Sequence, residues 1–90
     1  AALILSFPDE MEAARLGREI GMAAPNAEGV EVWGPAPAPI AVLRGRWRWR
    51  FLVRSDLGVD LSAYMAAWRK TLKLPAQARL QIDVDPYSFL

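Results

Sequence analysis

The sequence lacks several residue types on which enzymes and small secreted proteins depend. Its 90 residues contain no cysteine and no histidine. Without cysteine there is neither a disulfide framework nor a thiol nucleophile, which fits a reducing compartment such as the cytoplasm. Without histidine, general-base, metal-ligand and catalytic-triad arrangements lose the side chain that they use most often. A phosphate-binding loop of the form G-x-x-x-x-G-K-S/T is also missing. We therefore expect no catalysis, no cofactor and no metal in this chain.

The sequence also lacks a long apolar run. No stretch approaches the roughly 20 apolar residues that a membrane-spanning helix needs, so we predict a cytoplasmic protein without membrane contact. The hydrophobic share of 53% and the charged share of 23% are typical of a folded globule. Ninety residues suffice for one small domain, which we place over residues 1–90. Because the chain starts without methionine, inside an apolar run, we interpret it as part of a longer protein.

The apolar periodicity and the turn-forming residues predict four strands and two helices. We expect strands at about residues 1–7, 30–33, 40–54 and 79–85. We expect helices at about residues 9–23 and 60–74. Ser6 and Asp9 supply helix-start chemistry around Pro8, and Asp60 can cap the second helix. The glycine–proline stretch at residues 34–39 predicts a stiff extended connection, because each proline fixes φ.

The order strand, helix, strand, strand, helix, strand predicts an α+β fold of the ferredoxin-like, split β-α-β type. In such a β-α-β-β-α-β sandwich, both helices cover one face of a four-stranded antiparallel sheet. The other face is left open to water. A binding surface on that open face would be formed by the side chains that point away from the helices.

Residues 44–54 carry the clearest functional pattern in the sequence. Side chains alternate between the two faces of a strand. We expect Trp47 and Trp49 to face the helices, because burial of such large rings stabilises a core. The opposite face then presents arginines about 7 Å apart, a spacing comparable to that of successive phosphates on a nucleic-acid strand. The candidate DNA-binding residues are Arg44, Arg46, Arg48, Arg50 and Arg54.

An ordinary solvated sheet face is the alternative interpretation of these arginines. Glu31, Asp83 and Asp85 could neutralise part of the row from neighbouring strands. The segregation of charge favours binding, however, because residues 32–54 contain five arginines and no acidic residue. For Trp47 and Trp49, stacking on bases is conceivable, but packing in the core is the more usual role. Trp33 is less certain, since it falls on the polar side of its strand.

Three segments in succession resemble the C-terminal domain of the PriA family of replication-restart helicases, also called primosomal protein N′. They are Val32-Trp33-Gly34-Pro35-Ala36-Pro37-Ala38-Pro39-Ile40, Arg44-Gly45-Arg46-Trp47-Arg48-Trp49-Arg50 and Ile82-Asp83-Val84-Asp85-Pro86. The resemblance covers essentially the whole chain. It implies a C-terminal fragment of an ATP-dependent 3′-to-5′ DNA helicase that recognises stalled forks and starts primosome assembly. The ATP site and the zinc-binding cysteines of such a helicase would lie outside this chain.

The resemblance also implies partners for the domain. These are branched or single-stranded DNA, single-stranded-DNA-binding protein, and the helicase core of the same chain. The resemblance and the residue pattern agree on the five arginines as the DNA contact. No residues are assigned to single-stranded-DNA-binding protein, because the expected basic or amide groups are missing where the second helix begins. A protein-docking domain without direct DNA contact remains the alternative. An RNA-binding role would require exposed aromatic rings, and the alternation places Trp47 and Trp49 inside.

Overall fold

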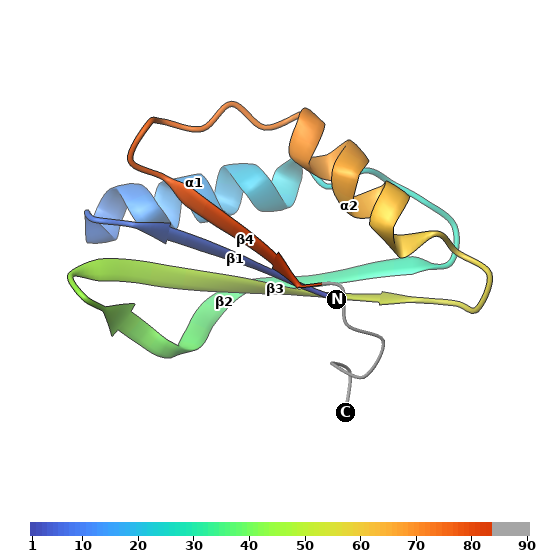
Figure 1. Ribbon diagram of the computed structural model, residues 1–90, viewed down its shortest axis with the longest axis horizontal. Coiled ribbons are helices and arrows are strands. Elements are labelled where there is room, and N and C mark those ends of the chain that lie inside the picture. Colours follow the sequence, from blue (N-terminus) through green and yellow to red (C-terminus); the bar gives the residue numbers. More distant parts are fainter. Residues whose placement is uncertain (84–90) are drawn as a thin grey trace.

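A computed structural model describes residues 1–83, in which two helices lie on one side of a sheet (Figure 1). The elements are β1 (Ala2–Phe7), α1 (Glu10–Met22), β2 (Val30–Leu43), β3 (Arg46–Ser55), α2 (Leu61–Lys70) and β4 (Arg79–Asp83). The strands lie in the order β2-β3-β1-β4, and every neighbouring pair is antiparallel. The predicted α+β class, the element order and the four-stranded antiparallel sheet are confirmed.

Both helices begin at an aspartate that caps free backbone amides. The Asp9 carboxylate accepts a hydrogen bond from the Glu12 amide at 2.9 Å, and that of Asp60 accepts one from Ala63 at 3.0 Å. The predicted end of the second helix is wrong, because α2 stops at Lys70 and not near residue 74. There the Thr71 hydroxyl donates to the Trp68 carbonyl at 2.8 Å. Such a local side-chain bond competes with continued helix.

The core lies between the sheet and the two helices, and Trp68 of α2 is at its centre. Its side chain is only 1% exposed, and its ring meets that of Phe51 on β3 edge-on, with centroids 5.4 Å apart. The indole Nε1 donates to the Ile20 carbonyl of α1 at 2.9 Å. One side chain therefore joins both helices and the sheet. The fully buried group also includes Leu3, Leu5, Ala13, Leu16 and Met65.

The predicted single strand over residues 40–54 is wrong, because the chain reverses within it. Residues 40–43 end β2, and β3 starts only at Arg46. The two residues between them have positive φ, 53° at Arg44 and 74° at Gly45. Positive φ at both central residues is the signature of the tight two-residue hairpin that matches strand twist. Arg44 therefore lies at a hairpin tip and not on the strand face to which we had assigned it.

The proline stretch is part of β2, contrary to the prediction of a separate connection after a short strand. β2 is an edge strand, where a missing amide hydrogen can face solvent. Its register with β3 shifts twice, between Trp33 and Ala36 and between Pro37 and Val42. At the second shift β2 has three more residues than β3, and its green end in Figure 1 bends away from the helices. Ala38, inside this bulge, is buried.

Candidate nucleic-acid interface

β3 separates two kinds of side chain, as the alternation predicted. Phe51 and Val53 are buried beneath the helices, and Trp47 and Trp49 are half-buried against the same core. A Cβ built at Gly17 of α1 would lie 3.7 Å from the Trp49 ring, so this helix packs directly on the indole. The predicted inward direction of Trp47 and Trp49 is confirmed. The side chains between them point to the sheet face that no helix covers, the open face.

Strand pairing brings residues from β3, β1 and β4 together on the open face. Across one row, Arg48 of β3 lies opposite Ser6 of β1, and Ser6 lies opposite Arg79 of β4. Two residues further along β3, Arg50 lies opposite Ile4 on β1. Arg79 was read only as a polar residue of the last strand, so its place beside the β3 arginines was missed. The predicted fold could have located Arg79, because the ferredoxin-like strand order places β4 next to β1 and β1 next to β3.

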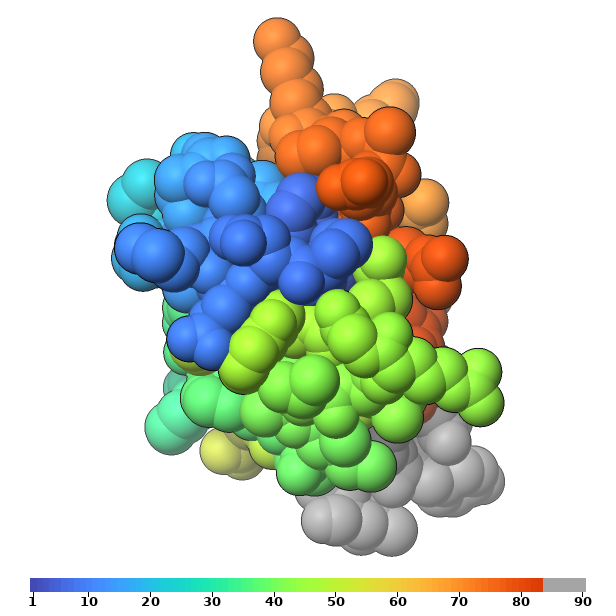
Figure 2. Space-filling model, turned by 90° about the vertical axis from the view of Figure 1, so that its left-hand side faces the viewer, coloured from blue at the N-terminus to red at the C-terminus, as the bar shows by residue number. Residues whose placement is uncertain are grey.

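A hollow on the open face, of about 690 Å³, collects most of these arginines. We call it the arginine hollow. It is lined by Arg44, Arg46, Arg48 and Arg79, together with Ile4, Ser6, Pro8, Leu43, Gly45, Leu80 and Gln81. No carboxylate is among these residues. Figure 2 shows this end of the molecule, where the green hairpin meets the blue β1–α1 connection and the orange-red chain leading into β4.

Two of the four arginines are held by hydrogen bonds to the protein. Arg46 donates from Nε to the Ser6 hydroxyl at 3.1 Å, and from one terminal nitrogen to the backbone carbonyls of Ser6 and Gln77. Arg48 donates to the Ile40 carbonyl in the β2 bulge at 3.0 Å. Because neutral oxygens leave the guanidinium charge uncompensated, both groups stay positive and have further N–H donors. The hollow thus holds fixed positive charge.

In the described part of the chain, no acidic side chain forms an ion pair with an arginine of β3. Among residues 1–83 the ion pairs are those of Arg15 with Glu12 and Glu19, at 2.7 and 2.6 Å on the surface of α1. This contact lowers the pKa of Glu12, chiefly through the hydrogen bond from Arg15. Glu31 lies opposite Arg54 in the ladder but forms no ion pair with it. Asp83 lies opposite Ala2 on β1 and forms no ion pair among the described residues, and Asp85 lies outside them.

The five arginines assigned from the sequence divide into three groups in the structure. Arg46 and Arg48 line the hollow and are braced, whereas Arg44 lines it from the hairpin tip. Arg50 lies next to the hollow on the same face. Arg54 is exposed at the other end of β3, away from the rest. The structure therefore brings together three of the five, adds Arg79, and leaves Arg54 apart.

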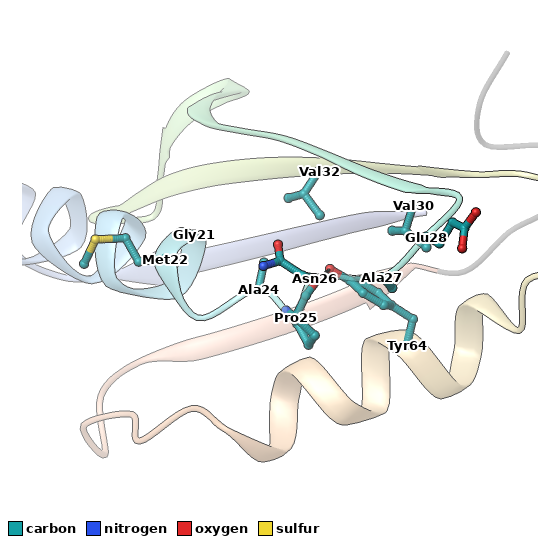
Figure 3. A pocket seen from close by; sticks show the side chains of 10 residues that line it. All are labelled: Gly21, Met22, Ala24, Pro25, Asn26, Ala27, Glu28, Val30, Val32 and Tyr64. Atoms are coloured by element: carbon teal, nitrogen blue, oxygen red, sulfur yellow. Dashed lines mark hydrogen bonds between the residues drawn. The ribbon is translucent and has the colours of Figure 1, made fainter.

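A second hollow, of about 510 Å³, lies beside the end of α1 and the start of β2, next to Tyr64 of α2 (Figure 3). The Tyr64 hydroxyl donates to the Pro25 carbonyl at 2.7 Å, and burial raises the pKa of Tyr64. Glu28 is the one charged residue among its lining side chains. Within residues 1–83 no cluster of three potential metal ligands occurs, and no helix is long and apolar enough to span a bilayer.

Sequence comparison identifies the family of this open-faced sheet. A family model described as the primosomal protein N C-terminal domain matches residues 1–87. The chain belongs to this family. The replication restart protein PriA of Rickettsia felis is 35% identical over 89 residues, which cover 99% of this chain and 14% of that protein. The PriA proteins of Rickettsia prowazekii and Rickettsia conorii are 35% and 34% identical, with the same coverage.

The match confirms the resemblance seen in the three motifs, including its extent over essentially the whole chain. The chain spans only 14% of the length of these PriA relatives. In these relatives, the matched segment is therefore a small share of a much longer replication restart protein.

Proposed function

We propose that this domain binds DNA by contacting phosphate groups through the arginine hollow. In the longer protein, this contact would help to recognise stalled forks and to assemble the primosome during replication restart. The ATP-dependent 3′-to-5′ helicase activity would belong to other parts of that protein. The domain would supply an anchoring contact and no chemistry of its own.

The observation that carries the proposal is four arginines around one hollow whose lining has no carboxylate. Like charges gathered in one place repel one another, so the arrangement has a cost that a bound polyanion removes. Guanidinium groups are also suited to phosphate, because their planar N–H donors match its oxygens in pairs. Arg46 and Arg48 are already positioned by backbone carbonyls, which reduces the side-chain entropy lost on binding.

Binding through phosphate contacts depends on the shape of the DNA and not on its base sequence. Phosphate contacts fix the position and orientation of a protein on DNA but carry no base information directly. Contact with about three phosphates predicts a log–log dependence of affinity on salt with a slope near −2 to −3. We expect the domain to bind forked or single-stranded DNA in this salt-dependent manner, with little preference among sequences.

The test is a double substitution in the hollow, Arg48→Ala with Arg79→Ala, measured by fluorescence anisotropy on forked DNA at several salt concentrations. The change removes two phosphate contacts, so the salt slope should become less steep by roughly 1.5–2. The affinity at low salt should fall about tenfold or more. Arg46 is left intact, because its bonds to Ser6 and Gln77 also support the fold.

The matched control removes the same charge from the helix layer, through Arg18→Ala with Lys70→Ala. Both residues are exposed and lie outside the hollow. This variant should lose much less affinity than the hollow variant. Equal losses in the two variants would mean that net charge, and not the hollow, governs binding. An unchanged affinity in the hollow variant would show that the arginines are only a solvated surface.

Protein docking without direct DNA contact is the second candidate. Ile40, Val42 and Leu43 of the β2–β3 hairpin are each about half exposed, which is unusual for three such apolar side chains in one short segment. Such a surface could contact the helicase core or single-stranded-DNA-binding protein. Titration of the domain with forked DNA and, separately, with an acidic tail peptide of that protein would separate the candidates. Binding of the peptide alone would favour docking.

A further inference from the structure

The end of the open face far from the arginine hollow exposes a tryptophan. Trp33 of β2 lies opposite Leu52 of β3, which lies opposite Ala2 of β1. Trp33 is 56% exposed and Leu52 is 43% exposed, whereas Trp68 is 1% exposed and Trp47 and Trp49 pack against the core. Trp33 therefore contributes little to the core. A large aromatic side chain that is exposed and does not pack in the core is a candidate to contact a ligand.

Two features fix the position of the Trp33 ring. Its Nε1 donates to the Glu31 carboxylate at 3.3 Å, which ties one edge of the indole to the strand. The next residue, Gly34, starts the first register shift of β2 and has φ of 122°. A Cβ at Gly34 would lie only 2.7 Å from the Arg50 carbonyl, so the backbones of β2 and β3 are in close contact there. Both contacts restrict the position of the Trp33 ring before a ligand binds.

The charges around Trp33 indicate what kind of ligand it meets. Arg50 and Arg54 stand two residues to either side of Leu52 on β3, so each is about 7 Å from it along the strand. Arg50 continues towards the arginine hollow at Arg48. Along β3 the open face thus presents the hollow, Arg50, the apolar pair of Trp33 and Leu52, and Arg54. Two acidic residues lie at the same end, Glu31 opposite Arg54 and Asp83 opposite Ala2. Alternation of cations with an aromatic platform is the arrangement used to bind single-stranded nucleic acid.

We propose that Trp33 stacks on an unpaired base of single-stranded DNA whose backbone is held by Arg50 and the arginine hollow. This inference rests on the proposed DNA-binding function and adds a choice of substrate to it. In a duplex the base faces are already stacked on one another, so the Trp33 ring has no free face to meet. Trp33 would therefore favour single strands, such as those exposed at a fork, over intact duplex.

The experiment compares the ninety-residue chain with its Trp33→Ala and Trp33→Phe variants on three probes of equal length. The probes are an oligodeoxythymidine, the same backbone with abasic sites, and a blunt duplex. Loss of one stacked base should weaken binding of Trp33→Ala to oligodeoxythymidine by roughly 5- to 150-fold. Binding to the abasic strand and to the duplex should not change, and the salt slope should stay the same. Trp33→Phe keeps a ring and should retain most of the affinity.

Thermal unfolding of each variant shows that the fold is intact before binding is compared. An equal loss on the abasic strand would overturn the stacking proposal, and so would an unchanged affinity for oligodeoxythymidine. In those two cases the proposed function would still stand if the salt slope of the Arg48→Ala, Arg79→Ala variant becomes less steep as predicted. Failure of the unsubstituted chain to bind any probe would overturn both proposals together. A Trp33→Ala variant that loses only binding to a protein partner would assign the ring to protein docking and overturn stacking.

Discussion

The two faces of β3 use the same strand for opposite purposes. Towards the helices, Phe51 and Val53 are buried completely and make part of the core. Towards the open face, Arg48 and Arg50 lie among other arginines and near an exposed apolar pair. The buried face stabilises the fold, whereas the clustered arginines of the open face are not required for folding. One set of alternate residues on β3 therefore stabilises the fold, and the other set forms the surface on which the proposed binding depends.

If this division is correct, the largest loss of stability should come from the helix face. Phe51→Ala removes a fully buried ring that contacts Trp68 edge-on. We expect the free energy of unfolding to fall by roughly 3–5 kcal/mol, from lost burial and the cavity left behind. Chemical denaturation followed by circular dichroism measures it. Leu52→Ala, one residue along on the open face, is the matched control and should cost less than about 1 kcal/mol, since Leu52 is only partly covered. Similar losses of stability in Phe51→Ala and Leu52→Ala would show that the two faces of β3 do not differ in their contribution to folding.

A smaller loss should come from the close approach of β2 to β3. Gly34→Ala places a methyl group 2.7 Å from the Arg50 carbonyl at a backbone conformation that favours glycine. We expect a loss of roughly 1–3 kcal/mol of stability, measured by the same denaturation. Gly45→Ala is the control, because Gly45 also has positive φ but nothing within 4 Å of the added methyl group. If the two variants are equally stable, the backbone conformation and not the contact is the cause.

The smallest of the three effects should come from the open face itself. Arg46→Ala breaks the bonds to Ser6 and Gln77, so we expect thermal unfolding to report a loss of about 1 kcal/mol. Arg44→Ala at the hairpin tip breaks no such bond and should change stability by less than about 0.5 kcal/mol. This pair sharpens the comparison, because it separates an arginine with a structural role from one that is available only for binding. Equal stabilities would mean that the bonds of Arg46 contribute nothing to the fold.

Much of the fold follows from the sequence because its local signals agree with the tertiary structure. Asp60 caps the second helix as predicted, and alternation places Trp47 and Phe51 inside. At the first helix, Asp9 is the cap, whereas Ser6, the other residue predicted to help start that helix, lies in β1. The hairpin at Arg44-Gly45 was missed because arginine is not a usual first residue of such a turn, and the apolar pattern runs on through it. Turn geometry here depends on pairing between β2 and β3, which no single segment of the sequence contains.

The candidate site was predictable only in part, for a similar reason. The arginine alternation along β3 can be read from one strand, and it led to Arg46 and Arg48. The role of Arg79 depends on pairing through β1, and the bracing of Arg46 depends on a carbonyl 31 residues away in Gln77. The position of Trp33 on the polar side of its strand left its burial uncertain, and the structure shows it exposed. The argument against an RNA-binding role considered only Trp47 and Trp49, so it does not apply to Trp33.

The prolines of β2 have a consequence for how partners can approach the molecule. β2 forms one margin of the sheet, and Pro35, Pro37 and Pro39 have no amide hydrogen to offer there. A foreign peptide that tried to extend the sheet along this margin would find donors missing at alternate positions. Strand addition and edge-to-edge self-association are therefore disfavoured along the proline segment of β2.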